Sequence, residues 1–208
     1  MLLPGCPLDP GPPAIELDPE GVADPVGGAK KFTLDQALAG YPVSEGVLTA
    51  LITTEKGPIR CELDEAAAPI TVANFVGLAR GTRPFRVTPR TWKVGRFYDG
   101  LIWHRVIPDF VIQGGDPLGN GRGGPGYNLV EENHVPEPLG TLAMAASNAP
   151  SGSQFYIVVG KGPPAGYNVF GDCETDVAKA IAAEPRNKAD KPVTDVHVQR
   201  IEIARCVK

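Results

Sequence analysis

Several features that would place this chain in a specialised class are missing from its 208 residues. No stretch approaches the roughly 18 consecutive apolar residues of a membrane-spanning helix, so we expect no transmembrane segment. The net charge is −4, and without an excess of positive charge there is no reason to expect nucleic acid as a partner. None of the four cysteines lies within metal-ligand spacing of another. This spacing argues against a zinc site, and we expect no metal or other cofactor.

The four cysteines lie in different contexts. Cys61 and Cys206 fall inside strand-like runs and are expected to be buried thiols. Cys173 and Cys206 could instead pair if their strands are neighbours. Leu3-Pro4-Gly5-Cys6 resembles the end of a bacterial lipoprotein signal, although the charged and apolar regions that precede such a site are missing. Two locations therefore stay open: the cytoplasm for a soluble protein, or the periplasm and cell envelope if Cys6 is lipidated.

Glycine and proline, by contrast, are abundant at 25 and 22 residues, which is typical of many turns between short strands. Residues 1–45 carry seven acidic residues, two lysines and little apolar periodicity. We predict that 1–45 is a Pro/Gly-rich acidic tail or linker, with a short helix turn over Thr33–Leu38 that Thr33 caps and Gly40 ends. Residues 46–208 then form a single domain, since a chain of this length can bury one good core and has little room for two.

The apolar pattern of this domain predicts about eight strands and two helices. Helical spacing covers 70–80, ended by Gly81, and 175–183, capped by Thr175. A basic loop that contains prolines is predicted for 81–96. Many short strands with two helices in one domain indicate a closed β-barrel plugged by helices. The strand patterns cover 47–54, 59–63, two runs within 101–116, 140–145, 153–159, a run from 169, and 196–204.

The stretch Leu101–Asp116 is predicted to be a hairpin of two short antiparallel strands. Strand alternation places Trp103 and Arg105 on the same face. A two-residue turn would set Arg105 opposite Ile112 and leave the guanidinium without a polar partner. A three-residue turn sets Arg105 opposite Gln113, and we prefer this register. An arginine and a glutamine on one face of an apolar hairpin indicate a functional site.

Two other interpretations of the motifs are weaker. Gly119–Gly124 matches the dinucleotide fingerprint G-x-G-x-x-G letter for letter, but a Pro-Gly pair follows and no helix begins there. We therefore predict a turn-rich loop. A hydrolase would combine Ser151 or Ser153 with His104 and an aspartate, yet no G-x-S-x-G elbow is present. His104 also faces away from Arg105 in the predicted strand and is expected to be a hydrogen-bonded structural residue.

The order of three motifs resembles the cyclophilins, the cyclosporin-type peptidyl-prolyl isomerases. Trp103–Asp116 (WHRVIPDFVIQGGD) is similar to their signature hairpin. Ser153–Ile157 (SQFYI) resembles a second signature and Val169–Gly171 (VFG) a third. The likeness runs from about residue 46 to 207 and includes both predicted helices, and the 81–96 loop resembles that of bacterial members. The motifs are long and occur in the right order, so the resemblance is specific.

The resemblance implies a closed eight-stranded antiparallel β-barrel capped by two α-helices, with the active site on its outer face. It implies a peptidyl-prolyl cis-trans isomerase that acts on proline-containing polypeptides and assists protein folding, and we expect a monomer. By position, Arg105 would be the catalytic arginine. The residues that would bind substrate are Phe110, Val111, Gln113, Ala145, Ala146, Ser147, Gln154, Tyr156 and Tyr167.

Three positions depart from the family pattern. Val111 stands where methionine is common, Ala146 stands where an asparagine commonly binds the peptide, and Gly162–Ala165 is short and lacks the usual tryptophan. Prolyl turnover should survive these changes, whereas cyclosporin should bind with reduced affinity. Because these three departures alter the border of the expected binding pocket, an alternative function stays open: a catalytically weak peptide-binding or chaperone module on the same barrel.

These residue types also suit the chemistry. Rotation about an X–Pro bond breaks amide resonance at a barrier of roughly 18–20 kcal/mol, and no covalent bond is made or broken. A catalyst need only bind the twisted amide better than either planar form. In the twisted state the nitrogen lone pair accepts hydrogen bonds, and a permanently charged arginine such as Arg105 can donate one.

Overall fold

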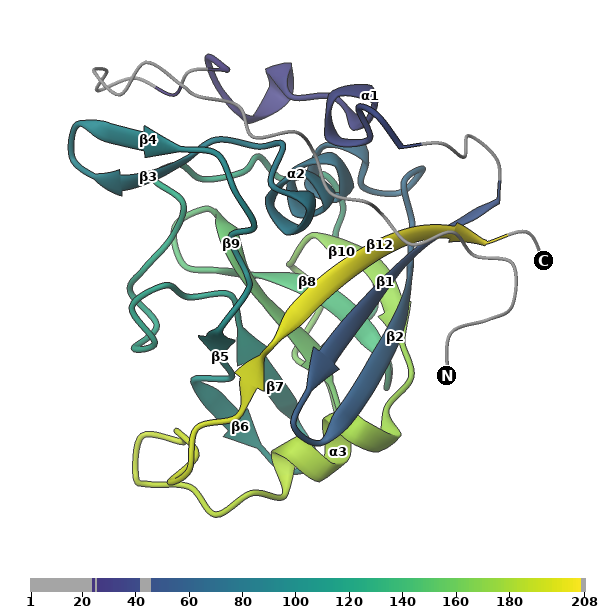
Figure 1. Ribbon diagram of the computed structural model, residues 1–208. Helices are drawn as coiled ribbons and strands as arrows, with labels where there is room; N and C mark the ends of the chain where they lie inside the picture. Colours follow the sequence, from purple (N-terminus) through teal and green to yellow (C-terminus); the bar gives the residue numbers. More distant parts are fainter. Residues whose placement is uncertain (1–23, 25, 42–45, 207–208) are drawn as a thin grey trace.

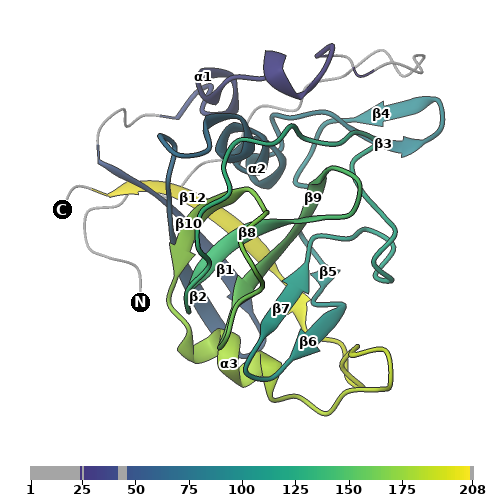
Figure 2. The same ribbon diagram turned by 180° about the vertical axis from the view of Figure 1, so that it is seen from behind.

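Short strands separated by turns form one antiparallel sheet of eight strands, in the order β12-β1-β2-β10-β8-β9-β7-β6 (Figures 1 and 2). The computed structural model describes residues 24, 26–41 and 46–206. The strands of this sheet are β1 (Val47–Thr54), β2 (Gly57–Leu63), β6 (Arg105–Ile107), β7 (Val111–Gly114), β8 (Thr141–Ala146), β9 (Pro150–Val158), β10 (Val169–Cys173) and β12 (Arg200–Cys206). The mainly β fold class predicted from the sequence is confirmed in this form.

Two shorter ladders accompany the large sheet. The strands β5 (Leu101–Ile102) and β11 (His197–Val198) pair with each other. The strands β3 (Phe85–Thr88) and β4 (Thr91–Lys93) form a hairpin inside the segment that was predicted to be a loop, 81–96. The loop prediction is therefore wrong in part, because the two strands have only four and three residues. The alternation of Phe85 and Val87 with Arg86 and Thr88 is too short to indicate a strand before Pro89 interrupts it.

Both predicted helices are present. The helix α2 (Pro69–Arg80) begins with a proline and ends at Gly81, whose φ of 82° is a left-handed conformation that favours glycine. The helix α3 (Asp176–Ala182) follows Thr175, but that side chain makes no capping hydrogen bond, contrary to the sequence prediction. A short helix α1 (Leu34–Ala37) has the expected Thr33 cap and follows a 3₁₀ turn at Ala29–Lys31.

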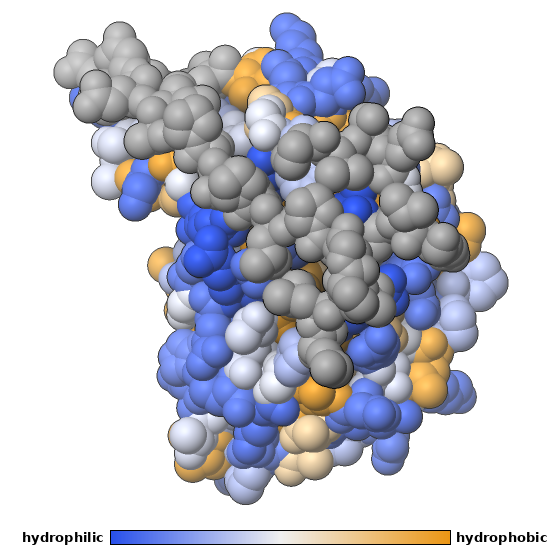
Figure 3. Space-filling view, turned by 45° about the vertical axis from the view of Figure 1, so that its right-hand side comes forward, coloured by the Kyte–Doolittle hydropathy of each residue, from blue (hydrophilic) through white to orange (hydrophobic). Residues whose placement is uncertain are grey.

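The core lies between the sheet and α2, and aromatic rings fill its centre. The ring of Phe75, on α2, lies 5.2 Å from that of Tyr98, 5.4 Å from Phe155 and 5.1 Å from Phe170, measured between centroids. Each such ring removes roughly 150–250 Å² from water, so these contacts join the helix firmly to the sheet. On the face drawn in Figure 3, hydrophilic residues predominate among the described ones and hydrophobic residues are scattered.

Trp103 lies in this core, with its ring centroid 5.5 Å from that of Phe155. The sequence predicted that it would share a face with Arg105, and that prediction is wrong. Residues 103 and 104 belong to neither strand but separate β5 from β6. Because the extended conformation is interrupted there, the alternation of faces does not continue across the break.

Cys61 and Cys173 form a disulfide. The sequence predicted a buried thiol at Cys61 and left open a pairing of Cys173 with Cys206, and both predictions are wrong. The reason is the strand order: β10 pairs with β2, which places Cys173 directly opposite Cys61, whereas β12 lies beyond β1. Cys6 lies outside the described residues.

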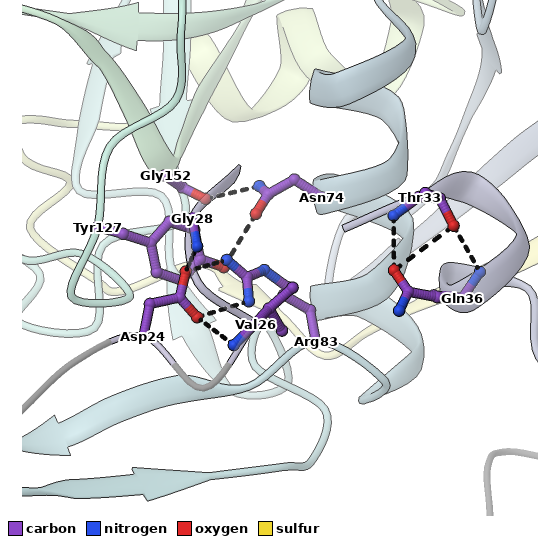
Figure 4. A network of polar contacts seen from close by, with 9 residues as sticks. All are labelled: Asp24, Val26, Gly28, Thr33, Gln36, Asn74, Arg83, Tyr127 and Gly152. Carbon is purple, nitrogen blue, oxygen red and sulfur yellow. Dashed lines mark hydrogen bonds and ion pairs between the residues drawn. The ribbon is translucent and has the colours of Figure 1, made fainter. Parts of the chain in front are cut away.

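Part of the segment predicted to be a tail packs against α2. Phe32 and Ala37 are buried members of the core cluster. The guanidinium of Arg83 donates to both carboxylate oxygens of Asp24 at 2.9 and 2.6 Å and lies over the ring of Tyr127 (Figure 4). It also lies over the ring of Phe32. Burial tends to raise the pKa of Asp24, but the hydrogen bonds and charge of Arg83 hold it below its ordinary value. The domain boundary near residue 46 stays a prediction.

Candidate active site

The hairpin of β6 and β7 has the register predicted from its polar residues. Arg105 lies opposite Gln113, and Ile107 lies opposite Val111, so the turn between the strands has three residues. Its middle residue, Asp109, has a φ of 56°, which aspartate tolerates better than most side chains. The register places the arginine and the glutamine side by side on the outer face of the sheet.

This face contains a cavity of about 140 Å³. Most of the residues predicted to bind substrate line it, and they come from β6, β7, β8, β9 and the segment before β10. One further residue, Pro163, belongs to the stretch in which the sequence analysis noted only a missing tryptophan. The lining residues are Arg105, Phe110, Val111, Gln113, Ala145, Ala146, Tyr156, Pro163 and Tyr167.

Arg105 is half-buried, and its guanidinium carbon lies 5.9 Å from the centroid of the Phe110 ring. In the described part of the chain, no carboxylate pairs with this guanidinium and no hydrogen bond reaches it. Its N–H groups are therefore free to donate to a molecule in the cavity. An arginine that only held the fold together would be expected to have such partners.

A chain of amide hydrogen bonds leads from the cavity to the loop Gly119–Gly126, called the glycine loop below. Gln113 Nε2 donates to Gln154 Oε1 at 3.0 Å, and Gln154 Nε2 donates to the carbonyl oxygen of Gly123 at 2.8 Å. The backbone N–H of Gln154 donates to Ser151 Oγ at 2.9 Å. Both glutamines are thus oriented, and the predicted site residue Gln154 is joined to the cavity through Gln113.

The floor of the cavity contains a buried polar pair that the sequence analysis missed. The hydroxyl of Tyr156 donates to Glu137 Oε2, and the ring of Tyr156 meets that of Tyr167 edge-on with centroids 5.6 Å apart. Burial raises the pKa of Glu137, although the bond from Tyr156 opposes this shift. Burial also raises the pKa of Tyr156, together with the bond to Glu137. Glu137 precedes β8 in an irregular segment, where no periodicity marks a residue as facing the interior.

The remaining predicted site residue, Ser147, lies beside the cavity and not in it. It lines a neighbouring hollow that shares Ala146 and Tyr167 with the first one. This hollow is part of the same surface, because the two shared residues form the wall between them. Ser147 is therefore placed to contact a longer ligand, and not one confined to the cavity at Arg105.

The two weaker interpretations find no support in the geometry. The hydroxyl of Ser153 donates to the carbonyl oxygen of Gly115 at 2.7 Å, and Ser151 Oγ accepts backbone N–H groups. His104 is buried and its ring makes no hydrogen bond with a described residue, which corrects the prediction that it is hydrogen-bonded. No serine–histidine pair is assembled there. The segment Gly119–Gly124 is a loop with no helix after it.

Among residues 24, 26–41 and 46–206, no group of histidine, cysteine and acidic side chains could hold a metal ion. Within the same residues, no helix is long and apolar enough to cross a membrane.

Comparison with known proteins identifies the arrangement. Residues 49–203 match the family model of the cyclophilin type peptidyl-prolyl cis-trans isomerase/CLD. Peptidyl-prolyl cis-trans isomerase A of Mycobacterium tuberculosis is 43% identical over 168 residues, which cover 75% of this chain and 92% of that protein. Peptidyl-prolyl cis-trans isomerase B of Streptomyces anulatus is 44% identical over 172 residues, covering 75% and 96%.

Solved structures give the same result. A cyclophilin type peptidyl-prolyl cis-trans isomerase of Cryptosporidium parvum superposes with a TM-score of 0.64 at 27% identity, covering 76% of this chain and 97% of that one. A structure of the same protein in the presence of the dipeptide Ala-Pro gives a TM-score of 0.63 at 26% identity, covering 77% and 99%.

Proposed function

The chain belongs to the cyclophilin-type peptidyl-prolyl cis-trans isomerases, and from this membership we propose how its own residues carry out the reaction. The activity of the enzyme is the cis–trans interconversion of X–Pro bonds. We assign the catalytic role to Arg105. The observation that carries this assignment is a guanidinium at the edge of the apolar cavity that has no hydrogen-bond or ion-pair partner among the described residues.

The proline ring enters the cavity beside Phe110, Val111 and Tyr156. These side chains exclude water, and a hydrogen bond gains strength when water is excluded from around it. The amide nitrogen then faces Arg105, which donates to its lone pair as the bond twists. In the planar forms that lone pair is delocalised and accepts poorly, so the interaction is stronger in the transition state than in the ground state.

The polar residues around the cavity hold the peptide backbone on either side of the proline. Gln113 and Gln154 orient each other, Ala145 and Ala146 end β8, and Ser147 follows them in the neighbouring hollow. Tyr167 lines the cavity beside Tyr156, whose ring it meets edge-on. In this assignment the hydroxyl of Tyr156 takes no part in the chemistry, because it is committed to Glu137.

The large sheet closes into a barrel in this proposal. Its two end strands are β12 and β6, and each directly follows a member of the short β5–β11 ladder. Because β5 and β11 pair antiparallel, this ladder joins the two ends of the sheet. The helix α2 then covers one opening and α3 the other, an arrangement that the two views of the ribbon support (Figures 1 and 2).

The natural substrates in this proposal are proline-containing polypeptides whose folding the enzyme assists, and the enzyme acts as a monomer. A protease-coupled assay on a short X-Pro peptide tests the activity. We expect a clear acceleration over the uncatalysed rate. Measurable peptide binding with negligible acceleration would instead favour the alternative, a peptide-binding or chaperone module.

In this proposal cyclosporin binds this protein more weakly than it binds relatives that have methionine and asparagine at the positions of Val111 and Ala146. The cavity has Val111 and Ala146 on its wall, where the family commonly has methionine and asparagine. A Val111→Met/Ala146→Asn double variant should bind cyclosporin more tightly than the wild type in a titration calorimetry experiment. Equal affinities would show that these two positions do not limit binding.

A further inference from the structure

A long part of the sequence is basic and contains no acidic residue. Residues 66–98 have no aspartate or glutamate but hold Arg80, Arg83, Arg86, Arg90, Lys93 and Arg96. Three of these cations are engaged inside the fold. Arg80 donates to the carbonyl of Ala37, Arg83 pairs with Asp24, and Arg96 donates to backbone carbonyls on α2 and β12.

The other three cations, Arg86, Arg90 and Lys93, lie on the β3–β4 hairpin and are exposed. We call this element the basic hairpin. A fourth exposed cation, Arg122, lies in the glycine loop beside it. None of the four side chains forms an ion pair or side-chain hydrogen bond with a described residue. They are a local concentration of positive charge on a protein whose net charge is −4.

The basic hairpin is fixed in place and is not a loose loop. Trp92 is buried and stacks on Tyr127, with centroids 6.4 Å apart and planes 11° from parallel. The hydroxyl of Tyr127 in turn donates to Asn74 on α2 at 2.9 Å. Both ribbon views show the hairpin extending beyond the large sheet as an arm (Figures 1 and 2).

The hairpin is connected to the active site through the glycine loop. The backbone N–H of Arg86 donates to the carbonyl of Pro125 at 2.9 Å, and Gln154 donates to the carbonyl of Gly123 at 2.8 Å. Gly123 and Pro125 are two residues apart, so the distance between them along the chain is roughly 7 Å at most. Arg122 is the immediate neighbour of Gly123. A peptide held by Gln154 that continues over the glycine loop therefore reaches Arg122 and the start of the basic hairpin at Arg86.

We propose that the basic hairpin and Arg122 form an extended substrate site that selects prolines in polypeptides with acidic residues several positions away. This inference rests on the proposed function, since it assumes that the peptide binds beside Arg105 and Gln154. The cations attract acidic segments during encounter and pair with them on the bound peptide. The selectivity follows from exposed charges, so salt weakens it.

Two labelled peptides with the same X-Pro core test this proposal. One peptide carries three glutamates and the other three lysines, placed four to seven residues from the proline. Each peptide is made in two versions, with the charged residues on the N-terminal or on the C-terminal side of the proline. Turnover is measured by NMR magnetisation exchange, because a coupling protease has charge preferences of its own. Affinity is measured in parallel by fluorescence anisotropy. At low salt we expect the wild type to favour the glutamate peptide about five- to tenfold with the charges on one side, since several exposed pairs each contribute little.

The double variant Arg90→Glu/Lys93→Glu should abolish or reverse this preference. These two residues are chosen because Arg86 packs against Gly126 and its replacement could shift the loop. The matched control is Lys179→Glu/Lys188→Glu, which changes the net charge equally at exposed positions on α3 and in the segment after it. The control should keep the wild-type preference, and 0.5 M salt should reduce it about as much as the hairpin variant does.

The proposal would be overturned if the wild type bound and turned over both peptides equally well. It would also be overturned if the hairpin variant kept the preference for the glutamate peptide. So would a single-stranded oligonucleotide that binds through Arg90 and Lys93 while the peptide preference does not depend on them. The ratio of the affinities for the two peptides, measured by anisotropy, separates this inference from the proposed function, because it does not depend on turnover. A chain that binds the glutamate peptide selectively but does not turn it over refutes the isomerase mechanism and leaves the acidic selectivity standing.

Discussion

Replacing Arg105 by alanine separates catalysis from folding, because the two effects of the change differ greatly in size. For folding, the described residues offer the guanidinium only its position over the Phe110 ring. Such a cation–π contact contributes about 0.5–1 kcal/mol at an exposed site. In a chain of this length that corresponds to a fall in Tm of roughly 1–4 °C.

The loss of activity should be much larger. Removing one preorganised donor to a transition state typically costs about 3–4 kcal/mol, or 10²- to 10³-fold in rate. Arg105→Lys should recover part of this loss, since lysine keeps the charge but not the planar guanidinium. As a matched control, Arg60→Ala removes an arginine from β2, where its partner is Glu62 and not a cavity residue. Its turnover should be close to that of the wild type.

The assay is protease-coupled release of a chromophore from a short X-Pro peptide, combined with thermal unfolding of each variant. A folded Arg105→Ala variant with activity within about threefold of the wild type would refute the assignment, because less than 1 kcal/mol of transition-state binding would then depend on the arginine. The catalytic donor would have to be another group near the cavity.

Three further predictions concern pH and stability. Turnover should be constant between about pH 6 and 8, since no group that titrates there takes part; a bell-shaped profile with a histidine-like pKa would contradict this. Asp24→Asn should lower the free energy of unfolding at pH 7 by about 3 kcal/mol, because it leaves Arg83 buried without its carboxylate. The pKa of Asp24 is below its ordinary value in the folded protein, so urea titrations should show this difference above pH 4–5 and its loss as the pH falls through the folded pKa. A Cys61→Ala/Cys173→Ala variant should lose about 2–5 kcal/mol of stability and keep its activity; unchanged stability would show that the crosslink contributes nothing.

The sequence predicted the register of the β6–β7 hairpin because two simple constraints act there together. Alternation along a strand decides which residues share a face, and a buried guanidinium opposite an isoleucine is too costly to be the native register. With the register known, Arg105 and Gln113 had to be neighbours, as they are. The helix α2 was equally clear, since its apolar spacing ends at a glycine that adopts the left-handed conformation.

The failures share a different cause, which is information that resides in the tertiary arrangement. The Cys61–Cys173 disulfide depends on β10 lying beside β2, and these strands are separated by more than a hundred residues. Glu137 reaches Tyr156 from an irregular segment, where no period indicates the direction of a side chain. Trp103 turned inward because the strand breaks beside it. Local patterns carry no signal for any of the three.

The geometry of the cavity and the stability of the core depend on the same strand register. On β7, Ile112 packs in the core while its neighbour Val111 lines the cavity; on β9, Ile157 and Tyr156 divide in the same way. A slip of one residue in either strand would place the cavity side chains in the core and expose the core ones. The free energy that opposes such a slip comes from burying the apolar core faces, so the same burial holds Val111 and Tyr156 in position on the cavity wall. The guanidinium of Arg105 adds little to this arrangement, because among the described residues it makes no hydrogen bond or ion pair and lies only over the ring of Phe110. Arg105 can therefore be replaced at little cost to the fold, whereas the apolar cavity cannot be lost without disturbing the register that the core requires.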